Sequence, residues 1–89
     1  MTEIVKKASA GTMESSDAYV EVEPAQTLAV ELQSVVQAQF GPAIEAAVAD
    51  VAAQCGVTKG RVKVMDRGAL ECVIRARVES AIFRGREEV

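Results

Sequence analysis

Apolar and polar residues alternate with a period of two in three segments of the chain, at residues 18–23, 28–33 and 61–65. Because successive side chains of a strand point to opposite faces, this alternation predicts three half-buried β-strands. Pro24 ends the first of them, since proline cannot continue a backbone hydrogen-bond ladder. The link of residues 23–26 is short enough for a hairpin, which predicts that the first two strands pair with each other.

A different period marks the middle of the chain, where apolar residues recur every three to four positions. They form one stripe at helical spacing: Ile44, Ala47, Val48, Val51, Ala52 and Cys55. Ser34 followed by Gln37 is a capping-box signature for the start of this helix, and Gly56 suits a left-handed C-cap. Gly41-Pro42 interrupts the pattern, so either the helix kinks there or a first turn ends and Pro42 opens the main helix.

Residues 69–84 alternate as a strand would, but they also carry a helical stripe. The apolar positions on that stripe are Leu70, Val73, Ile74, Val78, Ala81 and Ile82. On the opposite face Glu71, Arg75 and Glu79 are spaced for i, i+4 pairs. We predict a helix, because the segment is long for a strand in so small a domain and Gly85 suits a helix cap.

Together these elements predict an α+β fold, with a small antiparallel sheet packed against two helices in a single two-layer domain. The domain spans residues 1–89, and we expect residues 1–8 to be flexible and residues 85–89 to form a frayed tail. Residues 9–17 are small and polar, which predicts a turn-rich loop, and Asp66-Arg67-Gly68 predicts a second turn.

Composition narrows the classes of function. Aromatic residues make up 3% of the chain, too few for a base-stacking nucleic-acid platform. The absence of histidine excludes Ser-His and Cys-His nucleophile pairs and histidine metal sites. Cys55 and Cys72 lie among apolar residues without a C-x-x-C motif, which predicts free thiols that behave as small core residues.

The chain contains neither an apolar run long enough to span a membrane nor the pattern of a secretory signal. We therefore expect a cytoplasmic protein that binds neither membranes nor nucleic acids. Charge is unevenly distributed: residues 8–58 hold seven acidic and no basic residues, whereas residues 59–86 hold eight basic and three acidic residues. Either the basic block faces a partner or an anionic ligand, or the two blocks face each other in the fold and partly neutralise.

Ser15 is the one candidate for chemistry that the residues themselves suggest. It lies among small and polar residues before the first strand, so its hydroxyl should be exposed. Most serines in such turns only bond the local backbone. No base is adjacent in the sequence; a pair with Lys6 or Lys7 would supply one, but no pattern supports it. If Ser15 has a function, another protein must act on it.

Two motifs point to a known family. The run AGTMESSD at residues 10–17 resembles the modification motif of the citrate lyase acyl carrier protein, the gamma subunit of that enzyme. The run DRGALECVIRARVE at residues 66–79 resembles the second hallmark of the same family, and Gln39-Phe40-Gly41 also corresponds. The similarity extends in order from about Ala8 to Ala81. Many relatives have Gly where this chain has Ser16, and the Glu-Ser pair aligns the modified residue with Ser15.

The resemblance implies a carrier that is not catalytic on its own. In that family the serine carries 2'-(5''-triphosphoribosyl)-3'-dephospho-coenzyme A through a phosphodiester bond, and this position corresponds to Ser15. A separate transferase attaches the group, whose thiol holds acetyl and citryl groups as thioesters. The alpha subunit, an acyl transferase, exchanges acetyl for citrate, and the beta subunit, a lyase, releases oxaloacetate.

Two alternative functions remain open. The carrier subunit of malonate decarboxylase uses the same prosthetic group, and an unmodified adaptor protein would use its basic C-terminal half to bind a partner. Within that half, Arg61, Lys63 and Arg67, or Arg75 and Arg77, could pair with phosphates of the prosthetic group or with an acidic partner. Arg77 would interrupt the apolar stripe of a helix, and the alternative is a side chain whose stem packs while its head reaches water.

Overall fold

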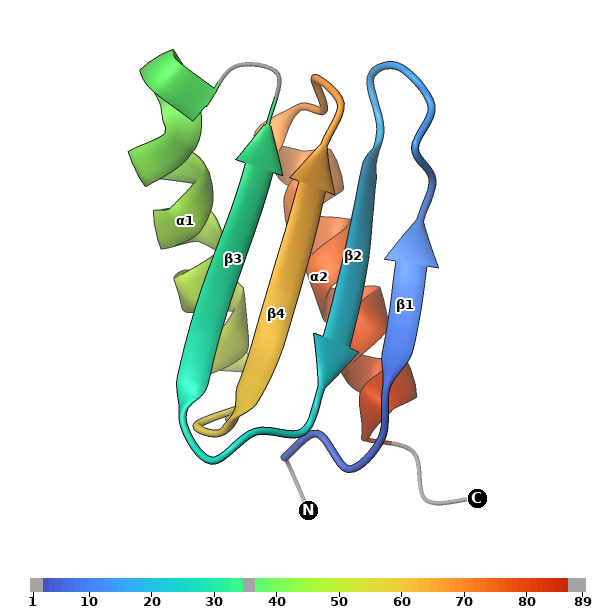
Figure 1. Cartoon of the computed structure of the whole chain (residues 1–89), viewed down its shortest axis with the longest axis vertical. Coiled ribbons are helices and arrows are strands. Elements are labelled where there is room, and N and C mark those ends of the chain that lie inside the picture. The colour runs from blue at the N-terminus through green and yellow to red at the C-terminus, as the bar shows by residue number, and fades with distance from the viewer. Residues whose placement is uncertain (1–2, 35–36, 87–89) are drawn as a thin grey trace.

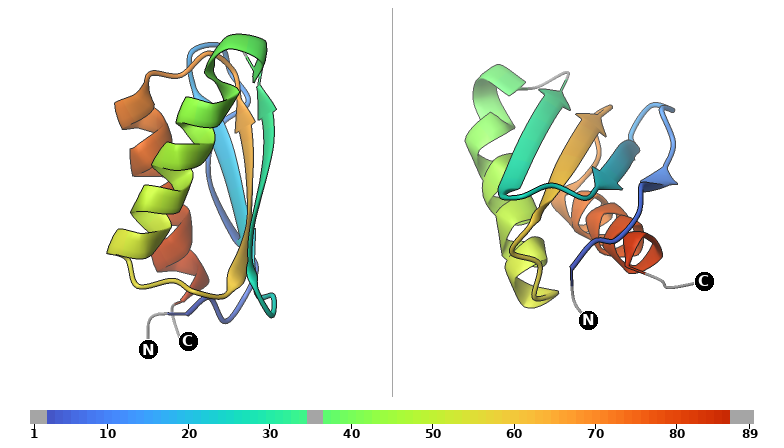
Figure 2. Two further views of the ribbon diagram at one scale, coloured as in Figure 1. Left: turned by 90° about the vertical axis from the view of Figure 1, so that its left-hand side faces the viewer. Right: turned by 60° about the horizontal axis from the view of Figure 1, so that its bottom comes forward.

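The computed structural model describes residues 3–34 and 37–86, without the side chains of residues 37–40. Four strands and two helices follow one another along the described chain: β1 (Ala8–Gly11), β2 (Ala18–Glu23), β3 (Leu28–Ser34), α1 (Gln37–Gln54), β4 (Gly60–Asp66) and α2 (Glu71–Gly85). The strands form one sheet, and both helices cover the same face of it (Figures 1 and 2). The predicted α+β architecture of one sheet packed against two helices is therefore confirmed. Among the described residues, no helix has the length and apolar character that a membrane span requires.

The order of the strands differs from the prediction. It is β1-β2-β4-β3, so β2 and β3 are not neighbours and the predicted hairpin between them is wrong. The sheet is also mixed rather than purely antiparallel, because β4 pairs antiparallel with β2 but parallel with β3. The reason is the helical crossover: α1 carries the chain back across the sheet, so β4 starts at the same end as β3. The central position suits β4, whose Val62 and Val64 are fully buried between apolar partners on both sides.

The segment that the sequence predicted as a loop contributes an edge strand. Ser9, Ala10 and Gly11 belong to β1, which pairs antiparallel with β2. Small side chains are weak strand formers, so the pattern did not reveal it. They are required here because α2 packs against β1, and Ala10 is 4% exposed beneath the helix.

Both helices bury the stripes that their periodicity indicated, with informative exceptions. Ile44, Ala47, Val48, Val51 and Ala52 of α1 are buried, and so are Ile74, Val78, Ala81 and Ile82 of α2. Leu70 is 72% exposed, contrary to its predicted place on the α2 stripe.

The two cysteines differ in their surroundings. Cys72 is exposed rather than in the core, because its position in α2 points away from the sheet. Cys55 is half-buried, and this burial raises the pKa of its thiol. Pro42 lies inside α1, so it does not open a separate helix.

The helix ends show which glycines the fold requires. Gly56 has a φ of 76°, and the Val57 amide donates to the Ala52 carbonyl, which confirms the left-handed C-cap of α1. Gly85 is not a cap but the last residue of α2, where an added Cβ would lie 2.8 Å from Val22 Cγ2. It is glycine because the helix and β2 approach closely there. Of the predicted capping box of α1, Ser34 is the last residue of β3 and its hydroxyl donates to Asp66, whereas the side chain of Gln37 lies outside the described part of the chain.

Candidate modification site

Ser15 lies at the tip of the loop between β1 and β2. The Asp17 amide donates to the Glu14 carbonyl at 3.2 Å, which closes a β-turn with Ser15 and Ser16 at its centre. The Ser15 side chain is exposed, and within the described chain no hydrogen bond engages its hydroxyl. The expectation of an exposed hydroxyl is therefore met, and no local backbone bond occupies it.

Ser16 is the residue that shapes this turn. Its φ is 67°, and no other non-glycine residue of the described chain has a positive φ. A turn with positive φ at its third position favours glycine there, because a Cβ is crowded in the left-handed region. This explains on physical grounds why glycine suits the position that follows Ser15.

Replacing Ser16 by glycine should therefore stabilise the protein. A side chain at positive φ costs about 1–2 kcal/mol, whereas the extra freedom of glycine in the unfolded chain costs about 0.5–1 kcal/mol. We expect Ser16→Gly to raise the free energy of unfolding by about 0.5 kcal/mol in urea titrations. Ser15→Gly is the matched control, because φ at Ser15 is not positive. It should lower stability, and a decrease of the same size for both variants would contradict the role of Ser16.

The Ser15 loop is joined to the loop that follows β4. The Ser16 amide donates to the Arg67 carbonyl at 2.8 Å, and the Arg67 amide donates to the Asp17 carbonyl at 2.9 Å. These bonds extend the ladder between β2 and β4 beyond the ends of both strands. Consequently the Ser15 loop of the first motif and the turn at residues 66–68, which begins the second motif, lie side by side at one end of the sheet (Figure 1).

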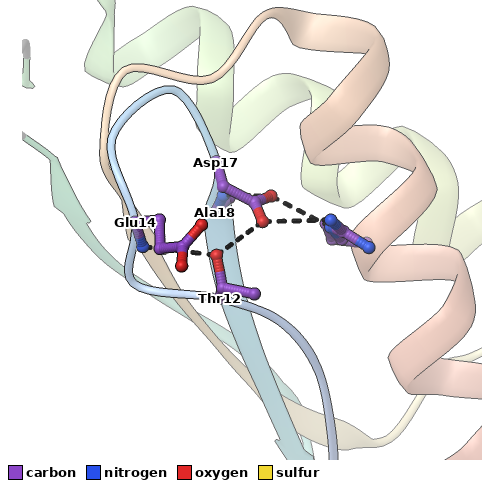
Figure 3. Close-up of polar contacts among 5 residues, drawn as sticks. Thr12, Glu14, Asp17 and Ala18 are labelled. Atoms are coloured by element: carbon purple, nitrogen blue, oxygen red, sulfur yellow. Dashed lines mark hydrogen bonds and ion pairs between the residues drawn. The ribbon is translucent and has the colours of Figure 1, made fainter.

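The carboxylate of Asp17 holds the Ser15 loop in place through several hydrogen bonds (Figure 3). Arg77 of α2 donates two hydrogen bonds to it, from Nε to Oδ1 and from Nη2 to Oδ2, both at 3.0 Å. The Thr12 hydroxyl donates to Oδ2 at 2.7 Å and accepts the Glu14 amide at 3.2 Å. The Arg77 guanidinium, together with Thr12 and the Ala18 amide, holds the pKa of Asp17 well below its usual range. The pair is thus ionised at neutral pH and ties the Ser15 loop to α2.

Asp66 fixes the neighbouring loop in a similar way. It is 2% exposed, and its Oδ1 accepts the amides of Gly68 and Ala69 at 3.0 and 2.8 Å. Its Oδ2 accepts the Ser34 hydroxyl at 2.7 Å, which links the end of β3 to the same point. An aspartate that precedes a glycine turn is a recognisable sequence signal for such backbone bonding.

The basic block is partly neutralised by the acidic first half of the chain, as one of the two interpretations of the charge distribution held: three of its eight basic residues form such pairs. Arg61 pairs with Glu23 and Glu31 at 3.1 and 2.9 Å, and Arg75 pairs with Asp50 at 2.7 Å. Arg77 and Asp17 form a third pair of this kind, in which a basic residue of the second half binds an acidic residue of the first half. Arg67 is exposed beside the Ser15 loop, and no side-chain bond engages it within the described chain.

The lysines of the N-terminal segment do not form the alternative Ser-Lys pair. Lys7 lines a shallow pocket with Glu23 and Arg61 and directly precedes β1, at the end of the sheet opposite the Ser15 loop. The Lys6 amide donates to the Gly85 carbonyl at that same opposite end. Among the residues that the structure describes, the site therefore consists of an exposed serine on an anchored turn, with no base beside it. Such a site can receive a group but cannot attach it unaided.

Comparison with known proteins agrees with the two motifs. Residues 5–85 match the family model described as malonate decarboxylase delta subunit (MdcD). A citrate lyase acyl carrier protein of Haemophilus influenzae is 49% identical over 86 residues, covering 97% of this chain and 90% of the relative. The protein of the same name in Escherichia fergusonii is 47% identical over 88 residues, covering 97% and 91%.

A solved structure shares the fold. A chain of the Pseudomonas malonate decarboxylase hetero-tetramer, crystallised with malonate, has a TM-score of 0.75. It is 20% identical, and the match covers 89% of this chain and 82% of that one. At this identity the likeness concerns the fold, whereas the sequence relatives carry the assignment. The chain therefore belongs to the citrate lyase acyl carrier protein family.

Proposed function

We propose that this chain is the acyl carrier subunit of citrate lyase and that the Ser15 Oγ is the attachment point of its prosthetic group. The observation that carries the proposal is the exposed, unengaged Ser15 hydroxyl on a turn anchored by both family motifs. The donor that the family implies is 2'-(5''-triphosphoribosyl)-3'-dephospho-coenzyme A. After loss of pyrophosphate its 5''-phosphoribosyl form would stay on Ser15, and the thiol that this group supplies would hold acyl groups as thioesters.

The residues present fit such an attachment. The Ser15 Oγ attacks the α-phosphorus of the donor triphosphate, a phosphodiester forms, and pyrophosphate leaves. The hydroxyl proton passes to a base of the transferase, because the described chain places no base within hydrogen-bond distance of Ser15. What this chain contributes is an exposed nucleophile in a fixed position, together with the exposed Arg67 beside it. A cation next to a phosphate group favours its binding.

The proposed partners are the alpha and beta subunits of citrate lyase and the transferase that modifies Ser15. A tethered thiol turns the transfer of acyl groups between subunits into an intramolecular step, with an effective concentration on the order of mM. The carrier thus supplies reach, whereas the other subunits supply catalysis. We propose that it acts in the cytoplasm, where free thiols such as Cys55 and Cys72 stay reduced.

The test is the intact mass of the chain purified from cells that contain an active transferase, followed by fragmentation of the peptide with Ser15. We expect a mass increase equal to the donor minus pyrophosphate, located on Ser15. A modification on Ser16 would keep the carrier function and correct the residue. An unmodified chain would contradict the proposal and leave the adaptor protein.

The malonate decarboxylase carrier is a second candidate, favoured by the family model over residues 5–85 and by the fold of the Pseudomonas chain. Because both carriers use the same prosthetic group, mass alone does not separate them. The subunits that copurify do: a partner that cleaves citrate supports the first proposal, and one that decarboxylates malonate supports the second.

A further inference from the structure

Leu70 occupies a position where its residue type lowers stability. It is the N-cap of α2, with φ −68° and ψ 155°, and no side-chain bond caps the helix. Serine, threonine, aspartate or asparagine at an N-cap would accept a hydrogen bond from a free helix amide. Leucine makes no such bond, and its side chain is 72% exposed. Neither packing nor capping explains it, and residues that break a local rule in this way cluster at functional surfaces.

An apolar groove adjoins Leu70. It has a volume of about 240 Å³ between the start of α2 and α1, and its apolar lining consists of Ala43, Ile44, Ala69, Leu70 and Ile74. Ile44 and Ile74 are buried and form its floor. An exposed apolar side chain beside an apolar groove indicates a surface that contacts another protein.

The groove and Ser15 are held in a fixed relation. The Asp66 carboxylate fixes the loop before Leu70 through the amides of Gly68 and Ala69. The backbone of Arg67, in that same loop, is hydrogen-bonded to Ser16 and Asp17. The position of the Ser15 hydroxyl relative to Leu70 is therefore fixed, so a protein that binds Leu70 can also reach the hydroxyl in a defined orientation.

We propose that Leu70 and this groove form the docking surface for the transferase that attaches the prosthetic group, and that the transferase inserts an apolar side chain there. The inference rests on the proposed function. The transferase must enclose the Ser15 hydroxyl itself, so it necessarily covers this end of the sheet. The alpha and beta subunits act on the thiol at the distant end of the attached group, and their contact with this end is not required by the chemistry.

The test measures steady-state attachment by the purified transferase, with the carrier as the varied substrate and mass spectrometry as the readout. For Leu70→Ser we expect KM to rise about tenfold or more, as for loss of a buried leucine contact, with kcat within about twofold. The melting temperature should rise by about 4 °C, because serine caps α2. Leu70→Met, which keeps an apolar side chain, should retain a KM near that of the unchanged chain.

Phe83→Ser is the matched control. Phe83 is 44% exposed and lies near the other end of α2, so its replacement also removes an exposed apolar side chain. Its KM should not change. An unchanged KM for Leu70→Ser, or an equal rise for Phe83→Ser or for Leu70→Met, would overturn the docking surface. If the unchanged chain is not modified at all, the proposed function itself fails, so the two failures are distinguishable.

Discussion

Ser15→Ala is expected to abolish attachment of the prosthetic group and, with it, citrate cleavage by the reconstituted complex. Removing the hydroxyl removes the proposed nucleophile, and the nearby Thr12 hydroxyl is engaged with Asp17 and Glu14. The side chain is exposed and unengaged, so the free energy of unfolding should change by less than about 0.5 kcal/mol. The measurements are intact mass after incubation with transferase and donor, and the rate of oxaloacetate release with the alpha and beta subunits present.

Ser16→Ala is the control for this experiment, because it removes the adjacent hydroxyl from the same turn. It should be modified in full and should support citrate cleavage at close to the unchanged rate. If Ser15→Ala is still modified while Ser16→Ala is not, the attachment point is Ser16. If both are modified, the carrier site lies outside this turn and the proposed site is wrong.

Gly11→Ala should have the largest effect on stability. Gly11 has a φ of 94°, and a Cβ there would lie 1.8 Å from the Ala18 carbonyl oxygen and 3.1 Å from Arg77 Cδ. The left-handed backbone costs alanine about 1–2 kcal/mol, and a clash with a backbone atom of a central strand adds to it. We expect a loss of about 3 kcal/mol or more in urea unfolding, and a decrease in melting temperature of about 12 °C or more.

Gly68→Ala separates the two causes. Gly68 has nearly the same φ, 91°, but an added Cβ would meet no atom within 4 Å. It should therefore lose only about 1 kcal/mol, the backbone cost less the reduced freedom of the unfolded chain. Equal losses at Gly11 and Gly68 would show that close packing at the start of the Ser15 loop contributes nothing.

Local periodicity identified most of the elements for a physical reason. A strand or helix in a two-layer domain must bury one face. Apolar residues therefore recur with a period of two along a strand and of about 3.6 along a helix. Ala18–Glu23 and residues 61–65 were recognised this way, and so was the stripe from Ile44 to Ala52. The strand Ala8–Gly11 escaped, because its small residues carry no such period and are dictated by the helix above them.

For the site, the sequence pointed to Ser15 chiefly through its resemblance to a family; the residues alone predicted only an exposed hydroxyl that, if it has a function, another protein must act on. It did not indicate what holds the serine in place. Asp17 and Arg77 are 60 residues apart and meet only because α2 crosses the sheet beside β1. The exposure of Leu70 was hidden as well, since the residue fits the helical stripe and leaves it only because the helix begins one residue later.

The amino-acid sequence by itself determined most of the elements, the α+β class and the identity of the family, because these depend on local patterns and on short motifs. Only the tertiary structure decided that β4 lies between β2 and β3 and that the loops of the two motifs meet at one end of the sheet. It also decided that Arg77 forms an ion pair with Asp17. A period of two tells which face of a strand is buried, but it is the same whichever strand lies alongside. The choice of neighbour depends on how all the apolar faces are buried together, which is a property of the whole packed chain.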